Sequence, residues 1–212
     1  MNHTLKKLLV EFIGTFFLVL TVGLTALKTP GGVIPPIAIG AILMTMVYAG
    51  GYISGGQYNP AVTFGVFVRG AMSVADSALY IFAQLLAGLA AAGVASFLKG
   101  GGQVAPVAGP LAPIFVAEFL FTFALVWVVL NVATAEGTKG HSFYGLAIGF
   151  TVLAGAFAVG PISGGAFNPA VVLGATLLGL INPASVWVYV LANLAGGAVA
   201  GLAFRAVDQG KA

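Results

Sequence analysis

The sequence predicts an all-α integral membrane protein with six transmembrane helices, two re-entrant half-helices and an inverted two-fold internal repeat. Three observations lead to this prediction. The 212 residues are 60% apolar and only 6% charged, with a mean hydropathy of +1.09, whereas soluble domains are about one-quarter charged. Six long apolar segments follow one another along the chain. One ten-residue polar motif occurs twice between them.

Each of the six apolar segments is close to the roughly 20 residues that a helix needs to cross a bilayer. They occupy residues 8–27, 35–53, 77–98, 113–132, 143–162 and 184–206. Glycine-containing breakers lie between them at 29–32, 99–102 and 136–140. The first segment follows Lys6 and Lys7, as in a signal peptide. It carries Glu11, continues to Leu27 and has no small-residue cleavage site, so a membrane span is the favoured reading.

The repeated motif reads as a glycine-rich loop that opens into a helix. Residues 53–62 are ISGGQYNPAV and residues 162–171 are ISGGAFNPAV, so eight of ten positions match. Asn suits the N-cap, and Pro suits the first helical position, where its missing N–H is not needed. We therefore predict helices over 60–68 and 169–180. At about 1.5 Å per residue they are too short for a hydrocarbon core about 30 Å thick, so they should be re-entrant.

The two halves of the chain carry the same elements in the same order. Glu11 precedes Asn59 by 48 residues, and Glu118 precedes Asn168 by 50. Each half holds three spans, an odd number, so the second half must lie inverted in the membrane relative to the first. We expect a single domain, 1–212, with repeats at about 5–98 and 112–207.

The basic residues indicate the orientation. With both termini in the cytoplasm, two basic residues, Lys28 and Lys99, lie outside. The other six are cytoplasmic: Lys6, Lys7, Arg69, Lys139, Arg205 and Lys211. Such an excess satisfies the positive-inside rule. The short loops and small size suggest a prokaryotic plasma membrane.

Inverted halves should bring Asn59 and Asn168 together near the middle of the bilayer. Each Asn caps its own half-helix through its side-chain oxygen and can offer its amide N–H to a solute. The two positive helix ends repel cations, and the low dielectric strengthens that repulsion. Because two copies of the motif occur in symmetric positions, a wet path for a small neutral molecule is favoured over two unrelated turns.

Glu11 and Glu118 are the acidic residues that fall inside apolar spans. A buried carboxylate is costly unless it is satisfied. One reading is a proton or ion relay. The other is that each carboxylate accepts hydrogen bonds from the backbone N–H groups of a glycine-rich loop and thereby turns the loop carbonyls toward the pore. The matched spacing favours this structural reading.

Several functions are disfavoured by what the sequence lacks. Cys is absent, so there is no thiolate metal site or cysteine nucleophile. We see no basic patch for nucleic acid, no catalytic constellation and no metal-ligand spacing, so no enzyme activity, cofactor or metal is expected. His3 and His141 both lie beside polar residues and are expected to be solvated.

The boxes Asn59-Pro60-Ala61 and Asn168-Pro169-Ala170, with a Glu early in the first span of each half, resemble the aquaporin (major intrinsic protein) family. The resemblance covers essentially the whole chain. It implies a homotetramer in membrane lipid with one pore per subunit, passive flux of water or small neutral solutes, and exclusion of protons and ions.

The resemblance also implies a selectivity filter and a set of pore-facing carbonyls. The filter positions are Ile39, Ala156, Gly165 and Val171. The carbonyl positions are Ser54, Gly55, Gly56, Gln57, Ser163, Gly164 and Ala166. Most family members have Arg where this chain has Val171, and water-selective members have a bulky aromatic residue and a His at the first two filter positions.

A filter without these side chains should be wide and apolar. We therefore expect a channel for polyols, urea, ammonia or neutral metalloid acids, with water passing too. The alternative within the family is a predominantly water-selective aquaporin. Outside the family it is a secondary transporter, because broken helices and inverted repeats occur in both classes.

Overall fold

The computed structural model describes residues 2–27, 32–100 and 106–207. Six helices within these ranges are long and apolar enough to cross a membrane. They are α1 (His3–Ala26), α2 (Ile34–Ser54), α4 (Val74–Lys99), α5 (Leu111–Thr134), α6 (Tyr144–Ser163) and α8 (Val186–Val207). The shorter elements are α3 (Pro60–Arg69), α7 (Pro169–Leu177) and the 3-10 turns η1 (Glu136–Thr138) and η2 (Pro183–Ser185). Lys28, Lys211 and parts of the breakers at 29–32 and 99–102 lie outside the described residues.

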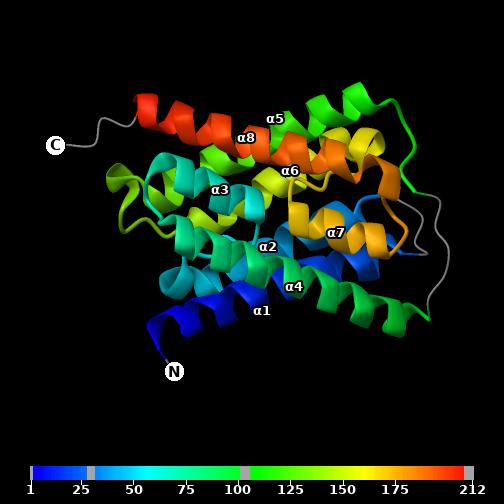
Figure 1. Ribbon diagram of the computed structural model, residues 1–212, viewed down its shortest axis with the longest axis horizontal. Helices are drawn as coiled ribbons and strands as arrows, with labels where there is room; N and C mark the ends of the chain where they lie inside the picture. Colours follow the sequence, from blue (N-terminus) through cyan, green and yellow to red (C-terminus); the bar gives the residue numbers. More distant parts are fainter. Residues whose placement is uncertain (1, 28–31, 101–105, 208–212) are drawn as a thin grey trace.

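The long helices run roughly along one axis and surround the two short ones (Figure 1). Helix α3 lies in the half of the bundle that holds the start of α1 and the end of α8, and α7 lies in the opposite half. Each short helix enters the bundle from its own end, so the predicted fold of six spans and two inverted half-helices is confirmed.

Each half-helix packs against the last long helix of the other half. Helix α3 contacts α8, and α7 contacts α4. A Cβ atom on Gly197 of α8 would lie 2.5 Å from the carbonyl oxygen of Ala61, and one on Gly88 of α4 would lie 2.7 Å from that of Ala170. Both positions therefore require glycine for the backbones to approach this closely. These crossed contacts join the two repeats into one body.

Several predicted boundaries differ from the structure by two to five residues, and two of them have a clear local cause. The second half-helix ends at Leu177 rather than at 180, because Gly179 adopts a φ of +75° and Leu180 N–H donates back to the carbonyl of Ala175 at 2.8 Å. The first span begins at His3 rather than at 8, because the side chain of Asn2 caps it by accepting from the N–H of Leu5 at 2.8 Å.

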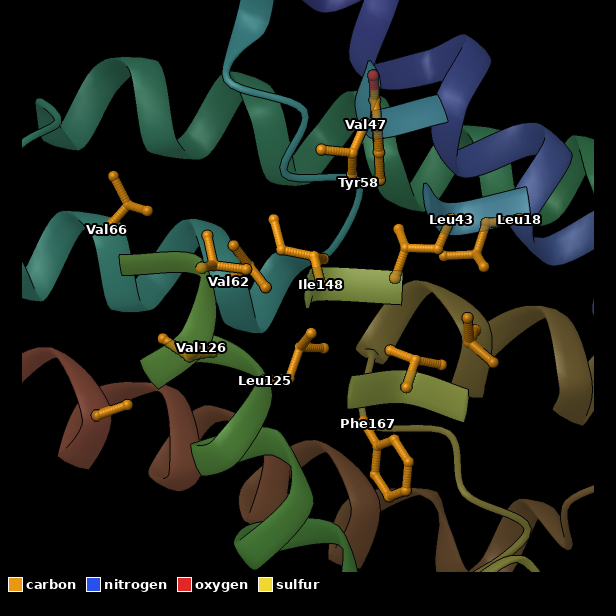
Figure 2. Close-up of a cluster of buried hydrophobic side chains, with 14 of the residues drawn as sticks. Leu18, Leu43, Val47, Tyr58, Val62, Val66, Leu125, Val126, Ile148 and Phe167 are labelled. Atoms are coloured by element: carbon orange, nitrogen blue, oxygen red, sulfur yellow. The ribbon is translucent and has the colours of Figure 1, made fainter. Parts of the chain in front are cut away.

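Between the two halves lies a cluster of buried apolar side chains (Figure 2). It brings Leu18 of α1, Leu43 of α2, Leu125 of α5 and Ile148 of α6 close to the two motif loops. Each of the eight α-helices in the described ranges contributes at least one residue to this cluster, so it packs the two repeats against each other.

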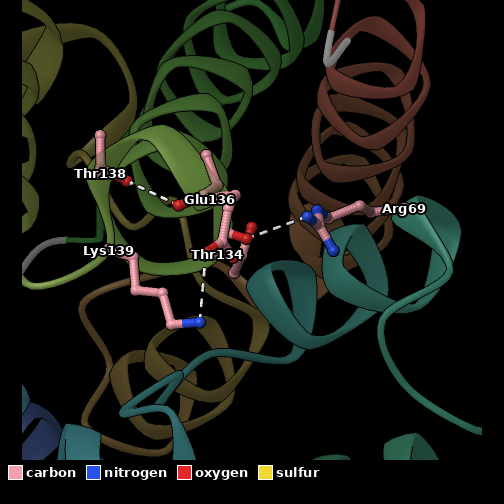
Figure 3. Close-up of polar contacts among 6 residues, drawn as sticks. Arg69, Thr134, Glu136, Thr138 and Lys139 are labelled. Atoms are coloured by element: carbon pink, nitrogen blue, oxygen red, sulfur yellow. Dashed lines mark hydrogen bonds and ion pairs between the residues drawn. The ribbon is translucent and has the colours of Figure 1, made fainter. Parts of the chain in front are cut away.

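The end of α3 is fastened to the second half by Arg69. Its Nη2 donates to the carbonyl of Thr134 at the end of α5, 3.0 Å away (Figure 3). Its guanidinium also lies 4.7 Å from the ring centroid of Phe204 in α8. Figure 3 also shows Lys139 beside Glu136; that ion pair is 3.2 Å long and exposed, so it adds little stability.

Candidate functional site

Asn59 and Asn168 begin α3 and α7, as predicted from their motifs. The Oδ1 of Asn59 accepts from the N–H of Ala61 at 2.8 Å, and the Oδ1 of Asn168 accepts from that of Ala170 at 2.9 Å. Pro60 and Pro169 occupy the first helical position of each half-helix. The free N–H groups of both helix starts therefore face the interface between the halves.

The amide nitrogens of the two Asn residues bind the opposite loop. Nδ2 of Asn59 donates to the carbonyl of Phe167, and Nδ2 of Asn168 donates to the carbonyl of Tyr58, both at 2.9 Å. An amide has two hydrogens, so each Asn retains one for a molecule beside it. The sequence predicted that each amide can offer an N–H to a solute, and the structure adds a reciprocal pair of bonds that joins the two loops.

Tyr58 and Phe167, whose carbonyls accept these bonds, are the described non-glycine residues with positive φ, +50° and +48°. Both rings are buried. The hydroxyl of Tyr58 donates to the carbonyl of Met46 at 2.9 Å, and Phe167 stacks on Phe121 with ring centroids 5.5 Å apart. Such backbone is uncommon for aromatic residues, so nothing in the sequence alone identified this turn.

Glu11 and Glu118 hold the motif loops, and their geometry fits the structural reading. Glu11 accepts from the hydroxyl of Ser54 (2.7 Å) and the N–H groups of Gln57 (3.0 Å) and Tyr58 (2.7 Å). Glu118 makes the same three bonds to the second loop, with donors Ser163 (2.7 Å), Ala166 (3.0 Å) and Phe167 (2.7 Å). Both carboxylates are fully buried.

A fourth donor on each carboxylate was missed by the sequence analysis. Nε2 of Gln84 donates to Glu11 and Nδ2 of Asn193 donates to Glu118, both at 2.9 Å. Tyr80 and Tyr189 were missed too. Each lies 26 residues after the serine of its loop and donates to that serine's carbonyl, at 2.9 Å for Ser54 and 2.7 Å for Ser163. A residue-by-residue alignment of the two halves could have found these matched pairs.

A cavity of about 740 Å³ runs between the two Asn residues and the four predicted filter positions. Its lining includes Asn59, Asn168, Ile39, Ala156, Gly165 and Val171. The motif loops contribute Gln57, Gly164 and Ala166 as well. Within the described part of the chain, the lining contains no charged side chain.

The other four predicted carbonyl positions do not line this cavity. The carbonyls of Ser54 and Ser163 accept hydrogen bonds from Tyr80 and Tyr189, and that these carbonyls face the pore stays a prediction. Gly55 and Gly56 are also absent from the lining. In each loop, the hydrogen bonds that the buried Glu accepts from the serine hydroxyl and from two loop N–H groups form what we call the carboxylate clamp.

Three residues outside both motifs, brought together by one backbone pairing, also line the cavity. Val107, in the connection between the halves, donates its N–H to the carbonyl of Leu180 at 3.0 Å and pairs with Ile181. Val107, Leu180 and Ile181 all line the cavity. Nothing in the local sequence around Val107 marks this role.

Six apolar spans, two half-helices that meet at capping Asn residues, and an uncharged cavity beside them define a multi-pass membrane channel. Comparison with known proteins identifies the family: residues 1–204 match the major intrinsic protein family. The chain belongs to that family, whose members are membrane channels, and it is a channel for water and small neutral solutes.

The chain is similar to family members from plants and bacteria. It is 39% identical to aquaporin NIP1-4 of Oryza sativa subsp. japonica, over 96% of this chain and 77% of that one. It is 34% identical to glycerol uptake facilitator protein-like 6 of Lactiplantibacillus plantarum, over 97% of this chain and 99% of that one. The fold matches the X-ray structure of the aquaglyceroporin from Plasmodium falciparum, with a TM-score of 0.82, 21% identity and 96% of each chain covered.

Proposed function

We propose that the channel has a wide, uncharged selectivity filter and passes small uncharged solutes such as polyols, urea, ammonia or undissociated metalloid acids, together with water. One observation carries the proposal. Ile39, Ala156, Gly165 and Val171, the four positions that the family resemblance assigns to the filter, line the same cavity, and all four lack charge and side-chain hydrogen-bonding groups.

Val171 is the decisive filter residue. It is the third residue of α7, beside the capping Asn168. The usual Arg at this position would supply a permanent positive charge and several fixed donors. Val supplies neither the charge nor the donors. It is also much smaller than Arg, so it does not narrow the opening and cannot hydrogen-bond a single row of water molecules. The cavity volume lies within the range of about 300–1,000 Å³ that is typical of sites for small organic molecules.

Because the filter side chains cannot form hydrogen bonds, the groups that can bind a solute in this way are the two Asn side chains and the backbone of the second motif loop. Asn59 and Asn168 each have one uncommitted amide hydrogen, and Gly164 and Gly165 contribute backbone to the lining. A neutral molecule with an oxygen acceptor satisfies these donors without a charge. The two helix starts disfavour cations there, although without Arg we expect a measurable residual cation leak.

The geometry gives less support to a secondary transporter. Coupled transport needs titratable or ion-coordinating groups at the binding site. In the cavity lining that the structure describes, no residue is acidic or basic, and both buried carboxylates are fully engaged with the loops.

We further propose a homotetramer with both termini in the cytoplasm of a prokaryotic plasma membrane. Large apolar side chains that cover the outer faces of the long helices, such as Phe97 at 84% exposure and Phe82 at 66%, support burial against lipid or neighbouring subunits. The excess of basic residues on the side of the termini supports the orientation. Short connections between the helices support the choice of membrane.

The test is stopped-flow light scattering on proteoliposomes, comparing shrinkage in sucrose with re-swelling in glycerol and in urea. We expect fast shrinkage followed by fast re-swelling in both solutes, with linear concentration dependence. Fast shrinkage without re-swelling would make the protein a water-selective aquaporin. Saturable, gradient-driven accumulation would instead identify a transporter.

A further inference from the structure

We propose that the side-chain amide of Gln57 is a second solute-selecting group, at the end of the pore opposite the filter. This inference rests on the proposed channel function and names a specificity-determining residue that the filter does not include. The corresponding position in the second motif is Ala166, which has no hydrogen-bonding side chain.

Gln57 lies between two cavities. The first is the large uncharged cavity described above. The second has a volume of about 220 Å³ and lies among the start of α1, the segment after α3 and the start of α4. Its polar lining includes Thr4, Lys7, Ser54, Ser73, Asp76 and Tyr80. Among the described residues, Gln57 is the one that lines both cavities. A solute that passes from the apolar space to the polar one therefore meets this amide.

The backbone of Gln57 is held firmly while its side chain is not. The N–H of Gln57 donates to Glu11 at 3.0 Å, as part of the carboxylate clamp. Its Nε2 donates only to the sulfur of Met72, 3.8 Å away, and a thioether is a weak acceptor. Its Oε1 is buried and has no hydrogen-bond partner. The Nε2–H group can therefore exchange its weak contact with Met72 for a hydrogen bond to an oxygen acceptor on a passing molecule.

The amide can act on solutes in two ways. It fills space between the cavities, so it limits the size of what passes. It also presents a weakly held N–H donor, which suits the oxygen acceptors of water, hydroxyl solutes and amide solutes. The filter around Val171 discriminates little by either criterion, because its side chains are small and apolar. Gln57 then supplies selection that the filter lacks.

Two substitutions distinguish the effect of the size of the Gln57 side chain on permeability from the effect of its hydrogen bonding. Gln57→Ala should raise permeability to a five-carbon polyol, relative to water, by about fivefold, because the side chain that fills the passage is removed. Gln57→Met keeps a similar length but cannot donate a hydrogen bond to a passing oxygen. It should lower water and urea permeability by about fivefold, the equivalent of one hydrogen bond. Unchanged permeability ratios in both variants overturn the proposal.

The absence of Cys from the sequence allows a direct test of position. In Gln57→Cys, Hg²⁺ should block water flux by more than about fivefold, and a thiol reagent should restore it. The control is Tyr52→Cys, near the same end of α2, where the side chain is 82% exposed and lines neither cavity. Wild type and this control should be unaffected.

The readouts separate failure of this inference from failure of the proposed function. If wild-type vesicles pass water but no larger solute, the wide filter is refuted, while Hg²⁺ block of Gln57→Cys still shows that residue 57 lies on the water path. If mass spectrometry shows full mercury labelling and water flux is unchanged, Gln57 is off the path and the inference is wrong. Mercury block combined with unchanged selectivity in Gln57→Ala and Gln57→Met also overturns it.

Discussion

Asn59 donates a hydrogen bond to the carbonyl of Phe167, 108 residues away, at 2.9 Å. The same side chain caps α3 through its other polar atom. One residue thus starts a half-helix and fastens it to the loop of the opposite half. Because Asn168 makes the equivalent pair of bonds, the centre of the channel is held by two interlocked amides.

Replacing either central Asn by Ala should destabilise the protein by a similar amount. Each variant loses a helix cap, about 1 kcal/mol, and a buried bond between the halves, about another 1 kcal/mol. Thermal unfolding of Asn59→Ala and Asn168→Ala in detergent measures this. Asn182→Ala is the control, since Asn182 makes an exposed cap at η2 without a bond to the other half. Markedly unequal losses for the two central residues would contradict the matched geometry.

Introducing Arg at position 171 should narrow the filter. Val171→Arg adds bulk, fixed donors and a positive charge opposite Ala156 and Gly165, so glycerol and urea flux should fall about tenfold or more while water flux persists. Any cation leak should fall as well. Val171→Leu adds bulk without charge and should reduce solute flux less and leave the leak in place. Equal glycerol flux in wild type and Val171→Arg would exclude a selecting role for this position.

Glu11→Gln tests whether the carboxylate supports the loop or relays protons. The substitution places an NH2 group against N–H donors, which breaks at least one buried charge-assisted bond at a cost of about 3 kcal/mol. We expect lower thermal stability and reduced flux at every pH, with the same result for Glu118→Gln. Glu136→Gln, on the exposed turn η1, serves as the control. A stable Glu11→Gln variant that loses only the pH dependence of flux would support a relay.

Tyr80→Phe and Tyr189→Phe should each cost about 1 kcal/mol, because each removes one buried hydrogen bond to a loop serine carbonyl. Water flux should change little, because neither tyrosine lines the large cavity and the hydroxyl of Tyr80, which lines the smaller one, is already bonded to the carbonyl of Ser54. Tyr52→Phe, at an exposed site, provides the baseline. A strong loss of flux without loss of stability would mean that the freed carbonyls matter to permeation directly.

Much of the fold could be predicted because it depends on local features. The six spans follow from apolar length, and the starts of both half-helices follow from Asn-Pro. The end of the second half-helix was harder to predict, because it depends on the turn at Gly179 and on the Leu180–Ala175 bond. Glu11 and Glu118 could be connected to their loops only because the same spacing occurs twice.

The sequence by itself determined the membrane class, the two-fold repeat and the caps at Asn59 and Asn168. These depend on residues within a few positions of one another, or on composition. Only the tertiary structure decided which loop residues line the cavity, that Gln84 and Asn193 complete the carboxylate clamps, and that Val107 joins the cavity lining. Those contacts join residues far apart in the chain, and their partners are chosen by how the two halves pack.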